Sequence, residues 1–144
     1  MHQENIAALA DRIAEIRILR EHHLWAAAGI FGLDDLDGTK RRKFRALMDA
    51  DALLDAVLLL AASAGPPRQV ENIGNHAGRW LCSMRYASTG GSRTCAARHA
   101  DLAAAVLAAL LASFQQPSMA RRRRASNFLQ HDRAHSHDTQ SRDH

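Results

Sequence analysis

Four side chains with the chemistry of metal ligands lie in the second half of the chain: His76, Cys82, Cys95 and His99. Cys95 and His99 are four residues apart, so one helical turn would place both beside a single zinc ion. His76 and Cys82 are six residues apart, a spacing that a regular helix does not bring to one point. The short Cys-x-x-Cys spacing typical of zinc sites does not occur in this sequence. We therefore predict two buried or half-buried thiols, with neither a metal site nor another cofactor.

Cys95 is also the better candidate for a reactive thiol, because Arg93, Arg98 and His99 surround it in the sequence. A nucleophilic cysteine needs a base within hydrogen-bonding reach, and proximity in sequence does not provide that geometry. The carboxylates of the chain gather in one loop and at expected helix starts, where helix capping accounts for them. The sequence therefore favours a protein without catalytic activity.

The densest basic cluster spans residues 40–45, where five of six side chains are cationic and the sixth is Phe44. If this segment is helical, its arginines share a face and could contact phosphates. Further basic clusters lie around residues 79–85 and 121–124. The predicted nucleic-acid contacts are Lys40, Arg41, Arg42, Lys43, Arg45, Arg79, Arg85, Arg121, Arg122, Arg123 and Arg124.

Three carboxylates, Asp34, Asp35 and Asp37, precede the first of these clusters. In the calcium-loop register that puts the following glycine sixth, the first and twelfth positions would be Leu33 and Phe44. Neither side chain can bind a hard cation, so the calcium interpretation fails. The alternative to phosphate binding by the cluster is that these carboxylates cap the next helix and neutralise its cations.

Two aromatic residues, Trp80 and Tyr86, lie next to Arg79 and Arg85. Their rings could stack on bases while these arginines and Arg93 hold phosphates. The other interpretation is that both rings anchor the core with their polar edges exposed, and we favour it for Trp80.

The core prediction depends on a stretch without any polar side chain, residues 102–112. It is made of strong helix formers, and a helix that is apolar on every face must be buried on every face. Asp101 precedes it, where a helix start favours an acceptor and a negative charge. Residues 51–64 have a similar apolar character, so we expect the two helices to pack against each other.

An amphipathic helix is predicted over residues 4–28. Ile6, Leu9, Ile13 and Ile16 recur at spacings of three and four residues, which places them in one apolar stripe. Such a stripe can pack on the core or form a homodimer seam with a second copy of the chain.

The composition favours helices over strands. Ala and Leu carry most of the apolar content, and aromatic residues make up 5% of the chain. Between residues 68 and 98 we expect a helix over 76–86 and a flexible loop over 88–92. We predict an all-α protein: a small four- to five-helix bundle over residues 1–116, followed by a disordered Arg/His-rich basic tail over residues 117–144.

Charge is unevenly distributed along the 144 residues. Residues 1–64 carry 8 basic and 10 acidic side chains, residues 65–116 carry 5 and 2, and residues 117–144 carry 6 and 3. The segments therefore have net charges of −2, +3 and +3, and the basic second half suits a polyanionic partner. Without a signal sequence, a membrane-spanning stretch or a disulfide framework, a cytoplasmic protein that does not enter membranes is expected.

These observations predict a small non-catalytic accessory protein that binds nucleic acid electrostatically through its arginine-rich clusters. One alternative is a helical protein–protein adaptor or homodimer that uses the stripe in the first helix. The other alternative is a cysteine/histidine metal-binding protein.

Overall fold

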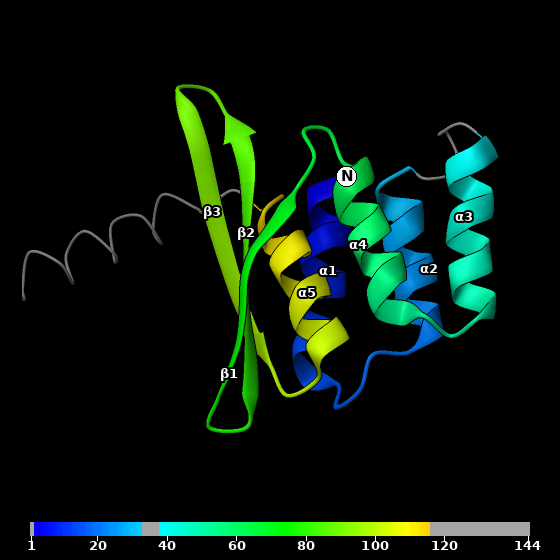
Figure 1. The fold of residues 1–144 in the computed structure, drawn as a ribbon, viewed down its shortest axis with the longest axis horizontal. Coiled ribbons are helices and arrows are strands. Elements are labelled where there is room, and N and C mark those ends of the chain that lie inside the picture. The colour runs from blue at the N-terminus through cyan, green and yellow to red at the C-terminus, as the bar shows by residue number, and fades with distance from the viewer. Residues whose placement is uncertain (1, 33–37, 116–144) are drawn as a thin grey trace, which may run out of the picture.

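Five helices and one three-stranded antiparallel sheet make up the computed structural model, which describes residues 2–32 and 38–115 (Figure 1). The helices are α1 (His2–Glu15), α2 (Glu21–Ile30), α3 (Gly38–Asp49), α4 (Leu53–Ser63) and α5 (Leu102–Ala112). The strands are β1 (Gln69–His76), β2 (Arg79–Ser88) and β3 (Gly91–His99). The prediction of an all-α bundle is therefore wrong, because a sheet fills the chain between α4 and α5.

The strands form because buried positions in this part of the chain recur at every second residue. On β2, Cys82 and Met84 are buried on the side of the helices, whereas Arg85 is exposed on the other side. A helix would instead bury positions three and four residues apart, so the helix predicted over 76–86 does not form.

Two tight turns set the register of the sheet. Ala77 and Gly78 join β1 to β2 with φ angles of +55° and +79°, as in the hairpin turns that match strand twist. Thr89 and Gly90 join β2 to β3, and Gly90 has a φ angle of +88°. The flexible loop expected over residues 88–92 is thus a two-residue turn between paired strand ends.

The apolar helix α5 lies at the centre of the fold, as predicted. It packs against β2 and β3 on one side and against α1 and α4 on the other (Figure 1). Residues 104–107 and 109–111 are all buried. The cap is also confirmed, because the Oδ2 atom of Asp101 accepts a hydrogen bond from the backbone N–H of Ala104 at 3.1 Å.

The single helix predicted over residues 4–28 is instead two helices, α1 and α2. Residues 16–20 break the helix because their backbone donors bind elsewhere. The N–H of Leu19 donates to Oδ2 of Asp101, and the N–H of Arg20 donates to Nδ1 of His23, both at 3.1 Å.

The apolar stripe of α1 belongs to the core of the single chain. Ile6, Leu9 and Ile13 are buried, and Ile16 packs against the same core. Core packing is therefore confirmed for the stripe, and the proposed homodimer seam is not exposed on α1.

Some predictions concern residues outside those that the structure describes. These are the predicted tail over 117–144, with its arginines 121–124, and the carboxylates at positions 34, 35 and 37. Within the described ranges, no helix is both long and apolar enough to cross a bilayer.

Candidate functional site

All the helices lie on one side of the sheet, and the described part of the chain leaves the other side uncovered (Figure 1). We call this uncovered side the outer face. Its side chains come from alternate positions of the three strands, and most are small or polar. The outer-face residues are Gln69, Asn72, Gly74, His76, Arg79, Leu81, Ser83, Arg85, Ala87, Ser92, Thr94, Ala96 and Arg98.

Three arginines project from this outer face: Arg79 and Arg85 on β2, and Arg98 on β3. Arg98 lies opposite Leu81, so Arg79 and Arg98 occupy diagonal positions of the two strands. The backbones of such positions are roughly 7–8 Å apart. Arg85 is paired with Glu71 at 3.8 Å, whereas no described carboxylate forms an ion pair with the other two arginines. The outer face therefore carries two arginines on diagonal positions that have no ion-pair partner among the described carboxylates.

The aromatic residues face the opposite way. Trp80 and Tyr86 occupy the positions of β2 that point toward the helices, and Trp80 packs against the core. The favoured interpretation of Trp80 is therefore confirmed. The structure separates these rings from Arg79 and Arg85, because successive residues of a strand point to opposite faces, whereas Arg93 lies opposite Tyr86 on the same face.

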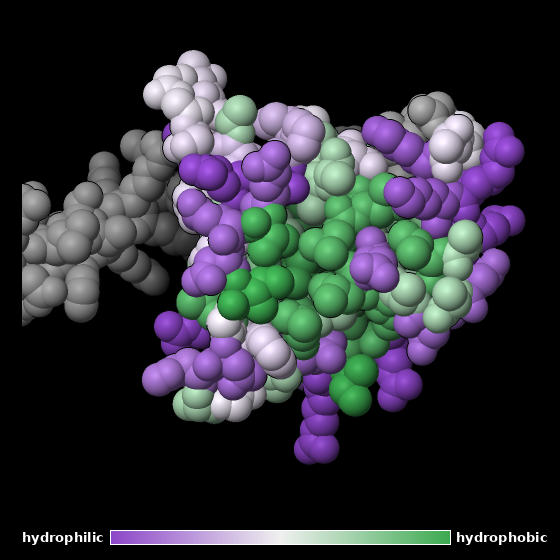
Figure 2. Space-filling view, in the orientation of Figure 1, coloured by the Kyte–Doolittle hydropathy of each residue, from purple (hydrophilic) through white to green (hydrophobic). Residues whose placement is uncertain are grey.

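The basic cluster of residues 40–45 forms most of α3, at the end of the molecule away from the sheet (Figure 1). Arg41, Arg42, Lys43 and Arg45 are exposed there. The space-filling view shows this hydrophilic surface in purple over α3, beside an apolar surface over α4 and α5 (Figure 2). The aromatic residue of the cluster, Phe44, is buried and packs edge-on against Trp25 at a ring distance of 5.2 Å. The predicted contacts on α3 and on β2 therefore form two separate surfaces.

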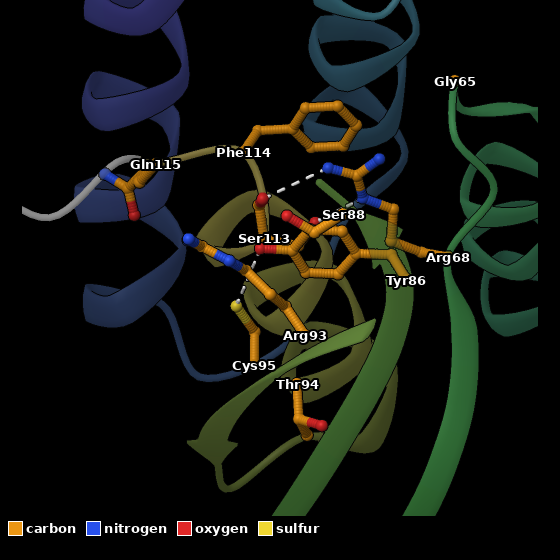
Figure 3. Close-up of a pocket in the computed structure, with 10 residues that line it drawn as sticks. All are labelled: Gly65, Arg68, Tyr86, Ser88, Arg93, Thr94, Cys95, Ser113, Phe114 and Gln115. Atoms are coloured by element: carbon orange, nitrogen blue, oxygen red, sulfur yellow. Dashed lines mark hydrogen bonds between the residues drawn. The ribbon is translucent and has the colours of Figure 1, made fainter. Parts of the chain in front are cut away.

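A pocket of about 450 Å³ lies where the upper ends of β2 and β3 meet the C-terminal end of α5 (Figure 3). Among the residues that the structure describes, no acidic side chain lines it. The residues that line it are Gly65, Arg68, Tyr86, Ser88, Arg93, Thr94, Cys95, Ser113, Phe114 and Gln115.

The side chain of Arg68 forms the inner wall of this pocket and is only 6% exposed. Its guanidinium lies between two rings, 4.3 Å from the centre of Tyr86 and 3.7 Å from that of Phe114. Nε donates to Oγ of Ser113 at 2.9 Å, and Nη2 donates to the carbonyl of the same residue at 3.2 Å. Nη1 donates to the carbonyl of Pro66 at 2.6 Å. Every one of these acceptors is neutral, so the buried positive charge has no anionic partner among them.

Burial lowers the pKa of Arg68, because a charged group is less stable away from water. The guanidinium nevertheless stays protonated, since its ordinary pKa lies far above neutral pH. A cation held in this way keeps a fixed position and a strong field inside the pocket.

Beside Arg68, the pocket also holds a phenol and a thiol. The hydroxyl of Tyr86 and Sγ of Cys95 are 3.9 Å apart, within hydrogen-bonding distance for sulfur. Burial raises the pKa of Tyr86, the contact with Cys95 adds to this rise, and the charges of Arg68 and Arg93 oppose it. The phenol therefore stays protonated at neutral pH and can donate a hydrogen bond.

The four metal-ligand candidates of the sequence do not meet. His76 is exposed on the outer face, whereas Cys82 is buried under the sheet, where burial raises the pKa of its thiol. Both ring nitrogens of His99 are engaged by backbone groups, at Ile13 and Asp101. Among the described residues, no group of three or more potential ligands could hold a metal ion. The helical turn expected to join Cys95 and His99 is a strand.

Sequence reasoning missed Arg68 entirely and did not assign Arg98 to a site. Arg68 follows two prolines and precedes a strand, a position that carries no recognisable motif. Arg98 could have been found from the alternation of β3, once the sheet was recognised.

No family model, no curated protein and no solved structure matches this chain. The fold defines a two-layer α/β protein, with five helices on one side of a three-stranded sheet. A function must therefore be argued from the two sites described above, the outer face of the sheet and the pocket around Arg68.

Proposed function

We propose that the protein binds the phosphate backbone of nucleic acid through the outer face of its sheet. The observation that carries this proposal is the placement of Arg79 and Arg98 as diagonal neighbours on an open face, without a described carboxylate paired to either. Guanidinium groups suit phosphate because their planar N–H donors match its oxygens.

The charge distribution supports this assignment. The sheet residues 69–99 carry four arginines and a single carboxylate, that of Glu71, whereas residues 1–64 have a net charge of −2. The sheet is thus one of two strongly basic elements of the described chain, the other being α3, and it is the one with an open face. A polyanion approaching the protein is attracted to that layer.

Apart from the imidazole of His76, the described residues of the outer face include no aromatic side chain to stack on bases. Its contacts would therefore be made to phosphates and would carry no direct sequence information. Three arginine contacts predict that the logarithm of the binding constant falls against the logarithm of salt concentration with a slope of roughly −3.

The test measures binding of the full-length chain to labelled duplex and single-stranded DNA and RNA at several salt concentrations. The double variant Arg79→Gln/Arg98→Gln should lower affinity several-fold and make the salt slope shallower by about two units. The matched control Lys43→Gln/Arg45→Gln removes the same charge from α3 and should leave the slope nearly unchanged.

A third variant replaces residues 121–124 with glutamine in the full-length chain. If affinity falls with this variant or with the α3 control, and the outer-face variant keeps wild-type affinity, the outer face is not the binding site. Absence of binding at low salt would exclude the proposed function altogether.

A further inference from the structure

A second kind of site is present on the inner side of the sheet, around Arg68. A cation that is 6% exposed loses most of its hydration, and hydrogen bonds to neutral oxygens return only part of that stabilisation. Here the rings of Tyr86 and Phe114 and three neutral oxygens surround the guanidinium. These contacts fix its orientation and leave two of its five N–H groups without a partner among the described residues. The arrangement is a preformed donor for an anion.

Arg93 provides a second positive charge to the same pocket. It pairs with Tyr86 across β2 and β3 and points to the inner side of the sheet (Figure 3). Two guanidinium groups and, within residues 2–32 and 38–115, no carboxylate line the pocket, so its field favours a doubly charged anion over a singly charged one. A phosphate monoester is a small biological group that carries this charge near neutral pH.

The remaining walls match the neutral part of such a ligand. Ser88 and Gln115 offer hydrogen-bonding groups, and the two rings beside Arg68 offer apolar surface. A volume of about 450 Å³ lies in the range of small-molecule sites. We infer that this pocket binds a small phosphate monoester, with its phosphate held between Arg68 and Arg93.

Cys95 provides a direct readout of occupancy, because it lines the pocket and is half-buried. The other cysteine, Cys82, is fully buried under the sheet and serves as an internal control. The experiment follows alkylation of each cysteine by iodoacetamide in the native full-length protein, with peptide mass spectrometry to separate the two sites. Phenyl phosphate is the dianionic probe, benzoate is the singly charged probe, and sodium chloride at equal ionic strength controls for screening.

The expected result is that phenyl phosphate slows alkylation of Cys95 by about tenfold at ten times its dissociation constant. Benzoate and sodium chloride should protect much less. Arg93→Gln should raise the concentration of phenyl phosphate needed for half-maximal protection about tenfold, because one of the two cations is lost. The side chain of Arg93 is exposed, so its replacement should not disturb the core. Arg98→Gln is the matched control, since this residue lies on the same strand but on the outer face.

Three results would overturn the inference: no protection by phenyl phosphate, equal protection by sodium chloride, or full protection in Arg93→Gln. Equal protection by benzoate would overturn the assignment to a dianion. The pair of variants also separates this site from the nucleic-acid surface. Arg98→Gln should weaken only nucleic-acid binding, and Arg93→Gln should weaken only the protection of Cys95.

Discussion

His99 and Asp101 together bind the backbone on both sides of the break between α1 and α2. Nε2 of His99 donates to the carbonyl of Ile13 at 2.8 Å, and Nδ1 accepts the N–H of Asp101 at 2.9 Å. The carboxylate of Asp101 in turn accepts the N–H of Leu19. The end of the sheet and the start of α5 are thus joined to the N-terminal helices by side chains that satisfy buried backbone groups.

Replacing His99 by alanine should lower the free energy of unfolding by about 2–4 kcal/mol, because it leaves a buried carbonyl and a backbone N–H without partners. Urea denaturation measures the loss. His76→Ala is the control, since His76 is exposed on the outer face and its removal should change stability by less than about 0.5 kcal/mol. Equal effects of the two variants would contradict this structural role of His99.

Replacing Asp101 by alanine should lower the free energy of unfolding by about 1–2 kcal/mol, because Oδ2 of Asp101 accepts the backbone N–H groups of both Ala104 and Leu19. Asp101→Asn keeps an oxygen acceptor and should recover much of that loss. Asp49→Ala, at the exposed end of α3, is the matched control. If Asp101→Asn were as unstable as Asp101→Ala in thermal or urea unfolding, the negative charge and not the acceptor would be the stabilising feature.

Stability should depend on pH through His23. Burial lowers the pKa of His23, and the positive charges of His22 and Arg12 lower it further. Its Nδ1 accepts the N–H of Arg20, a contact that requires an unprotonated nitrogen. The unfolded chain therefore binds a proton at a higher pH than the folded chain, and stability is lost as the pH falls below about 6.5.

The measurement compares urea unfolding at pH 7.5 and pH 5 for wild type, His23→Gln and His22→Gln. Glutamine keeps an acceptor and does not titrate, so His23→Gln should reduce the loss of stability on acidification, by at most about 1.4 kcal/mol per pH unit. His22→Gln removes one of the charges that lower the pKa of His23 but leaves its burial, so it should reduce the loss of stability less than His23→Gln does. A wild-type pH dependence in His23→Gln would show that another group is responsible.

The parts of the fold that sequence reasoning predicted depend on local signals. The helix over residues 102–112 and its cap at Asp101 follow from composition and from one residue at one position. The packing of α4 against α5 follows from their shared apolar character, and the burial of Ile6, Leu9 and Ile13 follows from their spacing.

The sheet was missed because its sequence is rich in arginine and glycine and poor in the usual strand formers. Two features of the sequence did indicate strands: apolar and polar side chains alternate over residues 80–86, and Gly78 and Gly90 lie at the turns. The pocket could not be predicted, since it depends on Arg68 reaching Ser113, a residue 45 positions away. Only the paired strands and the end of α5 bring these side chains together.

The turn between β1 and β2 offers a stabilising substitution. Ala77 has a φ angle of +55°, a conformation that costs an alanine roughly 1 kcal/mol and that glycine adopts freely. Ala77→Gly should therefore raise the free energy of unfolding by about 0.5–1 kcal/mol. Ala87→Gly, on an exposed position within β2, is the matched control and should lower it by a similar amount because strand glycine is entropically unfavourable. Urea midpoints that move in the same direction for both variants would contradict the strained turn and, with it, the register between β1 and β2.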